Sequence, residues 1–312
     1  AFERLRRIPP ITTLQENDEF CRILDESLEA HLVVIPRLAL GISECEQHID
    51  PDRLDRFMNG TLRSRISRRV ITEQHLVLSQ YKHGTAIDPS ADQTRHMPTV
   101  FSRCSAHDVV GTCSALAQAN ARQTHRQGQE WVPPQVHISS QDDDIRFTYV
   151  SEHIEYIIYQ ILSNSIRHTI AAHPSHYPPV EVTICSNQAD VFFRISDKGG
   201  GMSNDIHRHL WSYGRRPHSL FGNFRDISQL AAKPSEHLNV PLGIGLPMSR
   251  VYAEYWGGEI NVVTMDGCGT DAYVRIPMLG TQNENLDEER NDDHAASPSS
   301  PSPGVIRRQF IV

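Results

Sequence analysis

The chain has 312 residues and a formal net charge of −8, from 30 basic and 38 acidic residues. This length suits two domains with a sizeable core. The lack of a cationic excess argues against general nucleic-acid binding, because few cations are available to neutralise phosphates. No apolar run reaches the length that a membrane-spanning helix needs. The six cysteines form no CxxC pair, so we interpret them as reduced packing thiols.

Residues 1–130 carry the apolar spacing of long amphipathic helices, which predicts a helical bundle. The first helix is expected over 18–47, with Pro36 bending or dividing it. An Asp-Pro-Asp sequence marks the start of a second helix over 50–81, and a third follows over 105–126. The second helix also carries a row of arginines, for which a solvated face is the simpler interpretation. The predicted inward residues are Leu54, Phe57, Leu62, Ile66, Val70, Ile71 and Leu78 in the second helix and Val109, Val110, Cys113, Leu116 and Ala117 in the third.

Residues 131–280 have the pattern of a mixed α/β layer domain. The expected strands are 135–138, 180–185, 190–196, 259–264 and 271–276, and the expected helices are 151–172 and 246–256, with a short helical segment at 205–213 inside an irregular stretch over 203–242. Residues 281–312 are polar and rich in Pro and Ser. This composition predicts a disordered tail.

The predicted helix over 151–172 has one apolar face and one polar stripe. Tyr156, Gln160, Asn164 and Arg167 follow one another at helical spacing and therefore share that stripe. The Asn164 side chain offers a carbonyl oxygen, which suits Mg²⁺, a hard cation that takes its other ligands from phosphates and water. A solvated face with a stray asparagine is the alternative when this helix is considered alone.

Glycines follow the strand that ends at Asp197. A carboxylate in this position can accept a hydrogen bond from an adenine amino group. Gly199 and Gly201 allow the backbone to approach a ligand closely. A strand-end turn is the simpler interpretation of this short pattern by itself.

A second glycine pair, Gly243 and Gly245, precedes the helix over 246–256. Unpaired amides at a helix N-terminus attract phosphate, and glycine leaves room for it. The spacing matches neither a P-loop nor the dinucleotide fingerprint. Thr270, after a further glycine, could add a polar contact near a base, with a hairpin turn as the alternative.

In this order the motifs resemble the GHKL ATP-binding fold. They look most like its mitochondrial protein-kinase branch, which contains the pyruvate dehydrogenase kinases and the branched-chain α-ketoacid dehydrogenase kinase. The resemblance covers roughly residues 17 to 278. The segments that carry it are Ile195-Ser196-Asp197-Lys198-Gly199-Gly200-Gly201, Gly243-Ile244-Gly245-Leu246-Pro247-Met248-Ser249-Arg250-Val251-Tyr252-Ala253 and Gly267-Cys268-Gly269-Thr270-Asp271-Ala272, with 34–41 and 64–69 in the helical part.

The resemblance implies an α+β protein. A helical regulatory bundle over 1–130 would dock on a lipoyl domain, a GHKL α/β sandwich over 131–280 would bind ATP, and a polar tail would follow over 281–312. Members of the family phosphorylate serines on the decarboxylase component of a 2-oxoacid dehydrogenase complex and inactivate it. The family also implies the mitochondrial matrix, and a homodimer or a heterodimer with a paralogue.

The resemblance also assigns residues to a site for ATP and Mg²⁺. Asn164 would coordinate Mg²⁺, Asp197 would bind adenine and Thr270 would support the base. The stretch 203–242 would form a lid over ATP. The remaining nucleotide-site residues would be Arg167 and Leu246, with Gly199, Gly201, Gly243 and Gly245 on the phosphate side.

The sequence departs from the family pattern around the reacting groups. Gln160 stands where the family has a glutamate thought to act as general base, and a neutral amide cannot take a proton from serine. Ser163 replaces a lysine and Tyr156 replaces a histidine. Pro241 replaces the first glycine of the second glycine motif, the one that contains Gly243 and Gly245. The Asp-Trp motif of many family C-termini is missing.

We therefore expect an ATP-dependent serine kinase of a 2-oxoacid dehydrogenase complex, with the pyruvate complex preferred over the branched-chain complex and Gln160 as the residue at the catalytic position. Gln160 would orient the serine hydroxyl, and a phosphate oxygen or water would receive the proton. Glu152 or Glu155 is an alternative base, although we expect both to lie off the polar stripe. The alternative is an ATP-binding regulatory subunit that is catalytically impaired and pairs with an active paralogue. A sensor histidine kinase is rejected, because no phospho-acceptor motif is found in the helical part.

Overall fold

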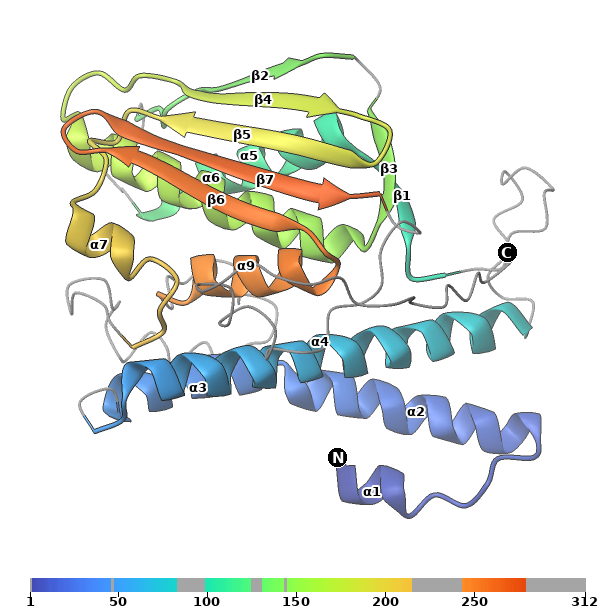
Figure 1. Ribbon diagram of the computed structural model, residues 1–312. Coiled ribbons are helices and arrows are strands. Elements are labelled where there is room, and N and C mark those ends of the chain that lie inside the picture. Colours follow the sequence, from blue (N-terminus) through green and yellow to red (C-terminus); the bar gives the residue numbers. More distant parts are fainter. Residues whose placement is uncertain are drawn as a thin grey trace, which may run out of the picture.

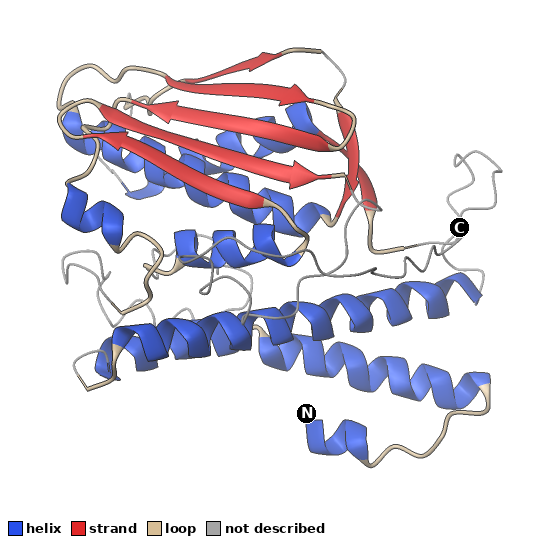
Figure 2. Cartoon of the chain, in the orientation of Figure 1, coloured by secondary structure: helices blue, strands red, loops and turns tan. Residues whose placement is uncertain are grey.

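The computed structural model describes residues 2–45, 48–82, 99–124, 131–142, 145–214 and 243–278. The molecule has one part made of helices and another in which helices cover a face of a β-sheet (Figure 1). Figure 2 shows the strands gathered in the second part alone. The α+β class and the order of the two parts are confirmed. The predicted tail over 281–312 and residues 215–242 of the predicted lid lie outside the described residues.

The helical part consists of α1 (Phe2–Arg6), α2 (Leu14–His31), α3 (Val34–Cys45) and α4 (Pro51–Lys82). A capping box starts α2: the Glu16 amide donates to Thr13 Oγ1 at 3.2 Å, and the Thr13 amide donates to Glu16 Oε2 at 3.0 Å. Pro36 divides the segment predicted over 18–47. A proline inside a helix clashes with the carbonyl four residues earlier. The break before α3 places Pro36 in a first turn, where proline is tolerated.

Helix α4 buries one row of apolar side chains spaced four residues apart. Leu54, Met58, Leu62, Ile66 and Val70 are each at most 7% exposed. The predicted inward orientation of two further residues is wrong, because Phe57 is 58% exposed and Ile71 is 66% exposed. Each of these two lies one residue from the buried row, which is about 100° of rotation around the helix axis.

Five strands form the main sheet in the order β2-β4-β5-β7-β6. They are β2 (Val136–Ser140), β4 (Val180–Ser186), β5 (Asp190–Asp197), β6 (Glu259–Met265) and β7 (Gly269–Pro277), close to the predicted ranges. β2 is parallel to β4, and the other neighbouring pairs are antiparallel. Alternate residues of β4 and β5 are buried, because helices pack on only one face of the sheet.

A second, two-stranded sheet pairs β1 (Ser102–Ser105) with β3 (Arg146–Tyr149) in antiparallel register. The sequence did not predict it, since four residues are too few to show an alternating pattern. This small sheet brings Phe147 and Tyr149 into the core, where they are at most 3% exposed.

Helices α5 (Ala106–Thr124), α6 (Ser151–Ala172) and α9 (Gly245–Tyr255) lie under the main sheet (Figure 1). α5 packs against α6 and β2, although its sequence resembles a third bundle helix. Four of its five predicted inward residues are buried, whereas Leu116 is 38% exposed. The division of the chain at residue 130 stays a prediction.

The short helix α7 (Asn204–Arg208) ends earlier than the helical segment predicted over 205–213. A single apolar core joins the helical part to the sheet domain, and it includes Met58, Ile157 and Phe193. None of the described helices combines the length and the hydropathy needed to cross a bilayer.

Replacing Met58 with alanine should destabilise the protein by about 2 to 5 kcal/mol, because the side chain is 0% exposed and its loss leaves a cavity. The neighbouring change Phe57→Ala is the matched control and should cost about 0.5 kcal/mol or less, as expected for a surface position. Urea denaturation followed by circular dichroism measures both. Equal losses in the two variants would contradict the assigned face of α4.

Candidate nucleotide site

The polar stripe of α6 faces the N-terminal half of α9. The Tyr156 hydroxyl donates to Met248 Sδ at 3.6 Å. Four residues along α6, a Cβ atom built on Gly245 would lie 2.2 Å from Gln160 Oε1. A glycine at the start of α9 therefore leaves the space that the Gln160 side chain occupies. The predicted shared face of Tyr156 and Gln160 is confirmed by these two contacts.

The next turn of the stripe brings Asn164 and Arg167 together. The Arg167 guanidinium donates to Asn164 Oδ1 at 2.9 Å. Burial lowers the pKa of Arg167. The Asn164 oxygen thus already accepts from a cationic group, and it suits a hard cation such as Mg²⁺ for the same electrostatic reason. Within the described residues no group of three or more His, Cys, Asp and Glu side chains could hold a metal ion.

Asp197 ends β5 as a largely buried carboxylate, 8% exposed. Its Oδ1 accepts a hydrogen bond from the Gly199 amide at 2.9 Å. A Cβ at Gly199 would lie 2.8 Å from His168 Cβ. Gly199, the first residue of the glycine box 199–201, therefore packs against α6. Burial, and secondarily the charge of Arg167, lower the pKa of His168. Asn164 and His168 lie about one turn apart on α6, and His168 contacts the turn formed by Asp197 and Gly199.

Thr270 is paired with Asp197 across the β5–β7 ladder. Its hydroxyl lies 3.3 Å from Thr264 Oγ1, which also accepts from the Met202 amide at 2.9 Å. The predicted Thr270 is therefore beside the Asp197 end of the sheet. Thr264 was not predicted, and only the tertiary pairing of β6 with β7 brings it to this point.

Two glycines are required by close backbone contacts. Gly201 has φ +69°, and a Cβ there would lie 2.1 Å from the Met265 carbonyl oxygen. A Cβ at Gly269 would lie 2.0 Å from the Asp197 carbonyl oxygen. These two close contacts bring the glycine box after β5 against the β6–β7 turn. The Gly267 amide also donates to the Gly200 carbonyl at 2.8 Å. A role for Gly201 on the phosphate side stays a prediction.

The second glycine cluster leads directly into α9. Gly243 has φ +69°, a conformation that favours glycine. α9 begins at Gly245, and Leu246 is partly buried against the core. The first amides of a helix have no intrahelical partner, so this helix start can receive a phosphate group. The Ser249 hydroxyl donates to the Gly245 carbonyl at 2.9 Å and thereby stiffens the first turn.

Helix α4 of the helical part is bonded to both helices of the site. Arg63, 7% exposed, donates to Glu254 of α9 at 2.8 Å, so the predicted solvated row of arginines is wrong at this position. Arg69 donates to Glu152 of α6 at 2.5 Å. Glu152 is held in this ion pair, about two helical turns before Gln160 on α6.

The start of the predicted lid is also fixed on α4. The Tyr213 amide donates to Asp55 Oδ1 at 2.7 Å, and the Tyr213 hydroxyl donates to Asn59 Oδ1 at 3.2 Å. Tyr213 is 1% exposed. The Arg250 guanidinium of α9 lies 5.2 Å from the Trp211 ring centroid. These contacts join the lid segment, α4 and α9, and no sequence pattern indicated them.

Two family models match this chain. Residues 1–111 match one described as mitochondrial branched-chain alpha-ketoacid dehydrogenase kinase, and residues 149–280 match one described as histidine kinase-, DNA gyrase B- and HSP90-like ATPase. The second range contains every residue proposed for the nucleotide site.

Three relatives are mitochondrial pyruvate dehydrogenase (acetyl-transferring) kinases. The chain is 26% identical to kinase 2 of Saccharomyces cerevisiae over 89% of this chain and 68% of that protein. It is 25% identical to the Arabidopsis thaliana kinase over 92% of this chain and 75% of that protein. It is 30% identical to isozyme 4 of Rattus norvegicus over 85% of this chain and 62% of that protein. The chain thus spans 62% to 75% of the lengths of these relatives.

Gly201→Ala should destabilise the protein by about 2 to 5 kcal/mol, the sum of left-handed strain and overpacking against a backbone carbonyl. Gly267→Ala is the matched control, since Gly267 has φ +78° and open space at its Cβ position. It should cost only about 1 to 2 kcal/mol. Urea denaturation of both variants measures the difference. Equal costs would show that the contact with Met265 does not constrain the glycine box.

Stability should also fall at acid pH because of His153. The Trp256 indole donates to His153 Nδ1 at 3.0 Å, which joins α6 to the end of α9. Burial, and secondarily the charge of Arg69, lower the pKa of His153 to about 3 from its ordinary value of 6.5. The unfolded chain therefore binds this proton first, and stability is lost as pH falls from 6.5 towards 3.

His153→Gln keeps a hydrogen-bond acceptor for Trp256 and removes the titration. In this pH window His153 should contribute up to about 1.4 kcal/mol per pH unit to the slope of the wild-type free energy of unfolding. The variant should lack this contribution. Denaturation curves collected at several pH values measure the slope. An unchanged slope in the variant would assign the acid sensitivity to other groups.

Proposed function

Because this chain belongs to the mitochondrial 2-oxoacid dehydrogenase kinase family within the GHKL superfamily, we propose that it is an ATP-dependent protein-serine kinase. Its proposed substrate is the decarboxylase component of the pyruvate dehydrogenase complex, which phosphorylation would inactivate. The observation that carries the proposal is the alignment of Gln160 and Asn164 on the face of α6 that meets the N-terminus of α9, with the Asp197–Gly199 turn packed on the next residue of this helix side, His168. The three relatives are pyruvate dehydrogenase kinases, which supports the choice of the pyruvate complex.

The adenine end of the ATP site is proposed at Asp197. One carboxylate oxygen is already ordered by the Gly199 amide, and the other would accept from the adenine amino group. Thr270, beside Asp197 in the sheet, would support the base. The adenine amino group donates one hydrogen bond, and the ionised Asp197 carboxylate would accept it.

The phosphate end of the ATP site is proposed between Asn164 and the start of α9. The amides at Gly245 and Leu246 would face the phosphates, and Gly243 would let the chain approach them. Asn164 Oδ1 would hold a Mg²⁺ ion, which would supply positive charge against the phosphates. Arg167 donates to this same oxygen in the structure, and it would have to release Asn164 when Mg²⁺ binds, because the two cations repel each other.

Transfer would occur between the γ-phosphate and a substrate serine beside Gln160. A bond forms between the serine oxygen and the γ-phosphorus, and the bond from that phosphorus to the oxygen retained by ADP breaks. Gln160 Oε1 would accept a hydrogen bond from the serine hydroxyl and thereby orient it. The proton leaves late, to a phosphate oxygen or to water, because an amide cannot take it.

The relatives are named as mitochondrial kinases, and we propose the mitochondrial matrix as the location of this chain. We also propose that the helical part, residues 1–130, docks on a lipoyl domain of the complex. A homodimer or a heterodimer with a paralogue is the proposed assembly. The alternative function, an impaired ATP-binding subunit, is favoured by one feature alone, the neutral amide of Gln160.

One assay separates the kinase from the impaired subunit. The protein is incubated with labelled ATP, Mg²⁺ and purified pyruvate dehydrogenase complex, and phosphoserine is counted on the decarboxylase component. We expect slow labelling by the wild type. The variant Gln160→Glu should be faster by about 10²- to 10⁴-fold, the usual contribution of a general base. ATP binding by the wild type without serine labelling would support the impaired subunit.

The nucleotide site is tested separately by direct ATP binding. Asp197→Asn should weaken binding by about 10-fold or more, since one lost hydrogen bond to a charged group is worth about 1.5 to 3 kcal/mol. Asp190→Asn changes the same residue type at the opposite end of β5 and serves as the matched control. Isothermal titration calorimetry measures both. Unchanged affinity in Asp197→Asn would remove Asp197 from the site.

A further inference from the structure

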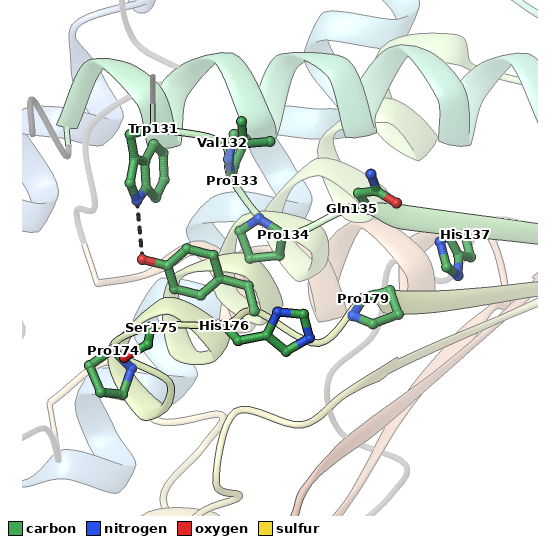
Figure 3. Close-up of a pocket in the computed structure, with 11 residues that line it drawn as sticks. Trp131, Val132, Pro133, Pro134, Gln135, His137, Pro174, Ser175, His176 and Pro179 are labelled. Carbon is green, nitrogen blue, oxygen red and sulfur yellow. Dashed lines mark hydrogen bonds between the residues drawn. The ribbon is translucent and has the colours of Figure 1, made fainter. Parts of the chain in front are cut away.

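A groove of about 600 Å³ opens at the end of the sheet where β2 and β4 begin. Its walls come from the segment before β2 and from the segment between α6 and β4 (Figure 3). Its apolar lining residues are Trp131, Val132, Pro133, Pro134, Pro174, Tyr177 and Pro179, and its polar lining residues are Gln135, His137, Ser175 and His176. None of these residues belongs to the proposed nucleotide site.

The aromatic pair in the groove is held in a fixed arrangement. The Trp131 indole donates to the Tyr177 hydroxyl at 3.1 Å, as the dashed line in Figure 3 shows. The two ring centroids are 5.9 Å apart, and the ring planes meet at 70°. Next to them, Val132 is 61% exposed. The groove therefore presents rigid apolar surfaces that need little ordering when a ligand binds.

A groove of rings and prolines of this kind fits a polyproline II segment. Such a segment has a preformed extended backbone with three residues per turn, so prolines spaced three apart lie on one side. Aromatic-lined grooves in other domains take PxxP segments in this way.

The same chain contains a segment of this type at Pro298-Ser299-Ser300-Pro301-Ser302-Pro303. Pro298 and Pro301 have the three-residue spacing, and this segment lies outside the described residues. The last described residue, Met278, is bonded through its amide to the Ala189 carbonyl at 2.8 Å, at the end of the sheet opposite the groove. Nineteen residues lie between Met278 and Pro298.

This length of chain is sufficient to reach the groove. The twenty Cα-to-Cα steps from Met278 to Pro298 span at most about 66 to 72 Å when fully extended. Strand β5, which runs from one end of the sheet to the other, has eight residues and is therefore about 26 Å long. The connection can thus pass around the domain with chain to spare.

We propose that residues 298–303 dock in this groove within the same molecule, as a polyproline II ligand of Trp131 and Tyr177. His173, directly before Pro174 of the groove wall, bonds through Nε2 to the Lys198 carbonyl at 2.9 Å. Lys198 directly precedes Gly199, so this hydrogen bond links the groove wall to the glycine box.

The indole resonances of the three tryptophans test the proposal in the full chain labelled with ¹⁵N-tryptophan. Tyr177→Phe removes the acceptor of the Trp131 indole and identifies its signal. The triple variant Pro298→Ala, Pro301→Ala and Pro303→Ala should shift that signal alone. A synthetic peptide with the sequence of residues 296–304, added to the triple variant, should return the signal to its wild-type position in a saturable way.

The matched control replaces Ser299, Ser300 and Ser302 with alanine and keeps the prolines. It should leave the Trp131 signal at its wild-type position. An identical signal in the wild type and the proline variant, with no response to the peptide, would overturn the proposal. A wild-type signal that changes with protein concentration would assign the segment to a second copy and overturn docking within one molecule.

Discussion

The packing of α9 on α6 is the constraint on which the rest of the site depends. Gly245 has no side chain, and the space that a Cβ would fill is occupied by the end of Gln160. The helix start that can bind phosphate is consequently held directly over the polar stripe of α6. The same approach lets the Tyr156 hydroxyl reach Met248 and the Trp256 indole reach His153. A bulkier residue at the start of α9 would separate the phosphate-binding amides from the stripe.

Two ion pairs attach the helical part to α9 and α6. Arg63 reaches Glu254 of α9, and Arg69 reaches Glu152 of α6. Both arginines lie on α4, which also holds Tyr213 at the start of the lid segment. A displacement of α4 therefore cannot leave the nucleotide site unchanged, because α6, α9 and the lid are each attached to it. In the proposed function, this is the physical route by which docking of the helical part would affect ATP.

In the proposed function, Gln160 at the position of the family's glutamate would separate ATP binding from proton transfer. An amide keeps the size and the acceptor oxygen of a glutamate, so the packing against Gly245 is compatible with either residue. It lacks the negative charge that would attract a proton from serine. The structure also offers no neighbouring carboxylate on the stripe among the described residues, because Glu152 is paired with Arg69. Any phosphoryl transfer at this site therefore relies on positioning and charge neutralisation.

Local patterns in the sequence determined the element types, the polar stripe of α6 and the glycine clusters, because helical and strand periodicity and glycine placement are properties of neighbouring residues. Together with the family resemblance, they led to Asp197, Asn164 and Gln160 as the proposed site residues. Tertiary structure decided the burial of individual side chains and the contacts between residues far apart in the chain, which those local patterns could not contain. Phe57 and Ile71 are exposed because α4 has one buried row whose direction depends on its partners. Arg63 is buried because Glu254 approaches from a helix far along the chain. Thr264 meets Thr270, and Gly201 meets Met265, only because β6 pairs with β7. Such contacts join residues that are distant in the chain, and their geometry exists only after the elements have packed together.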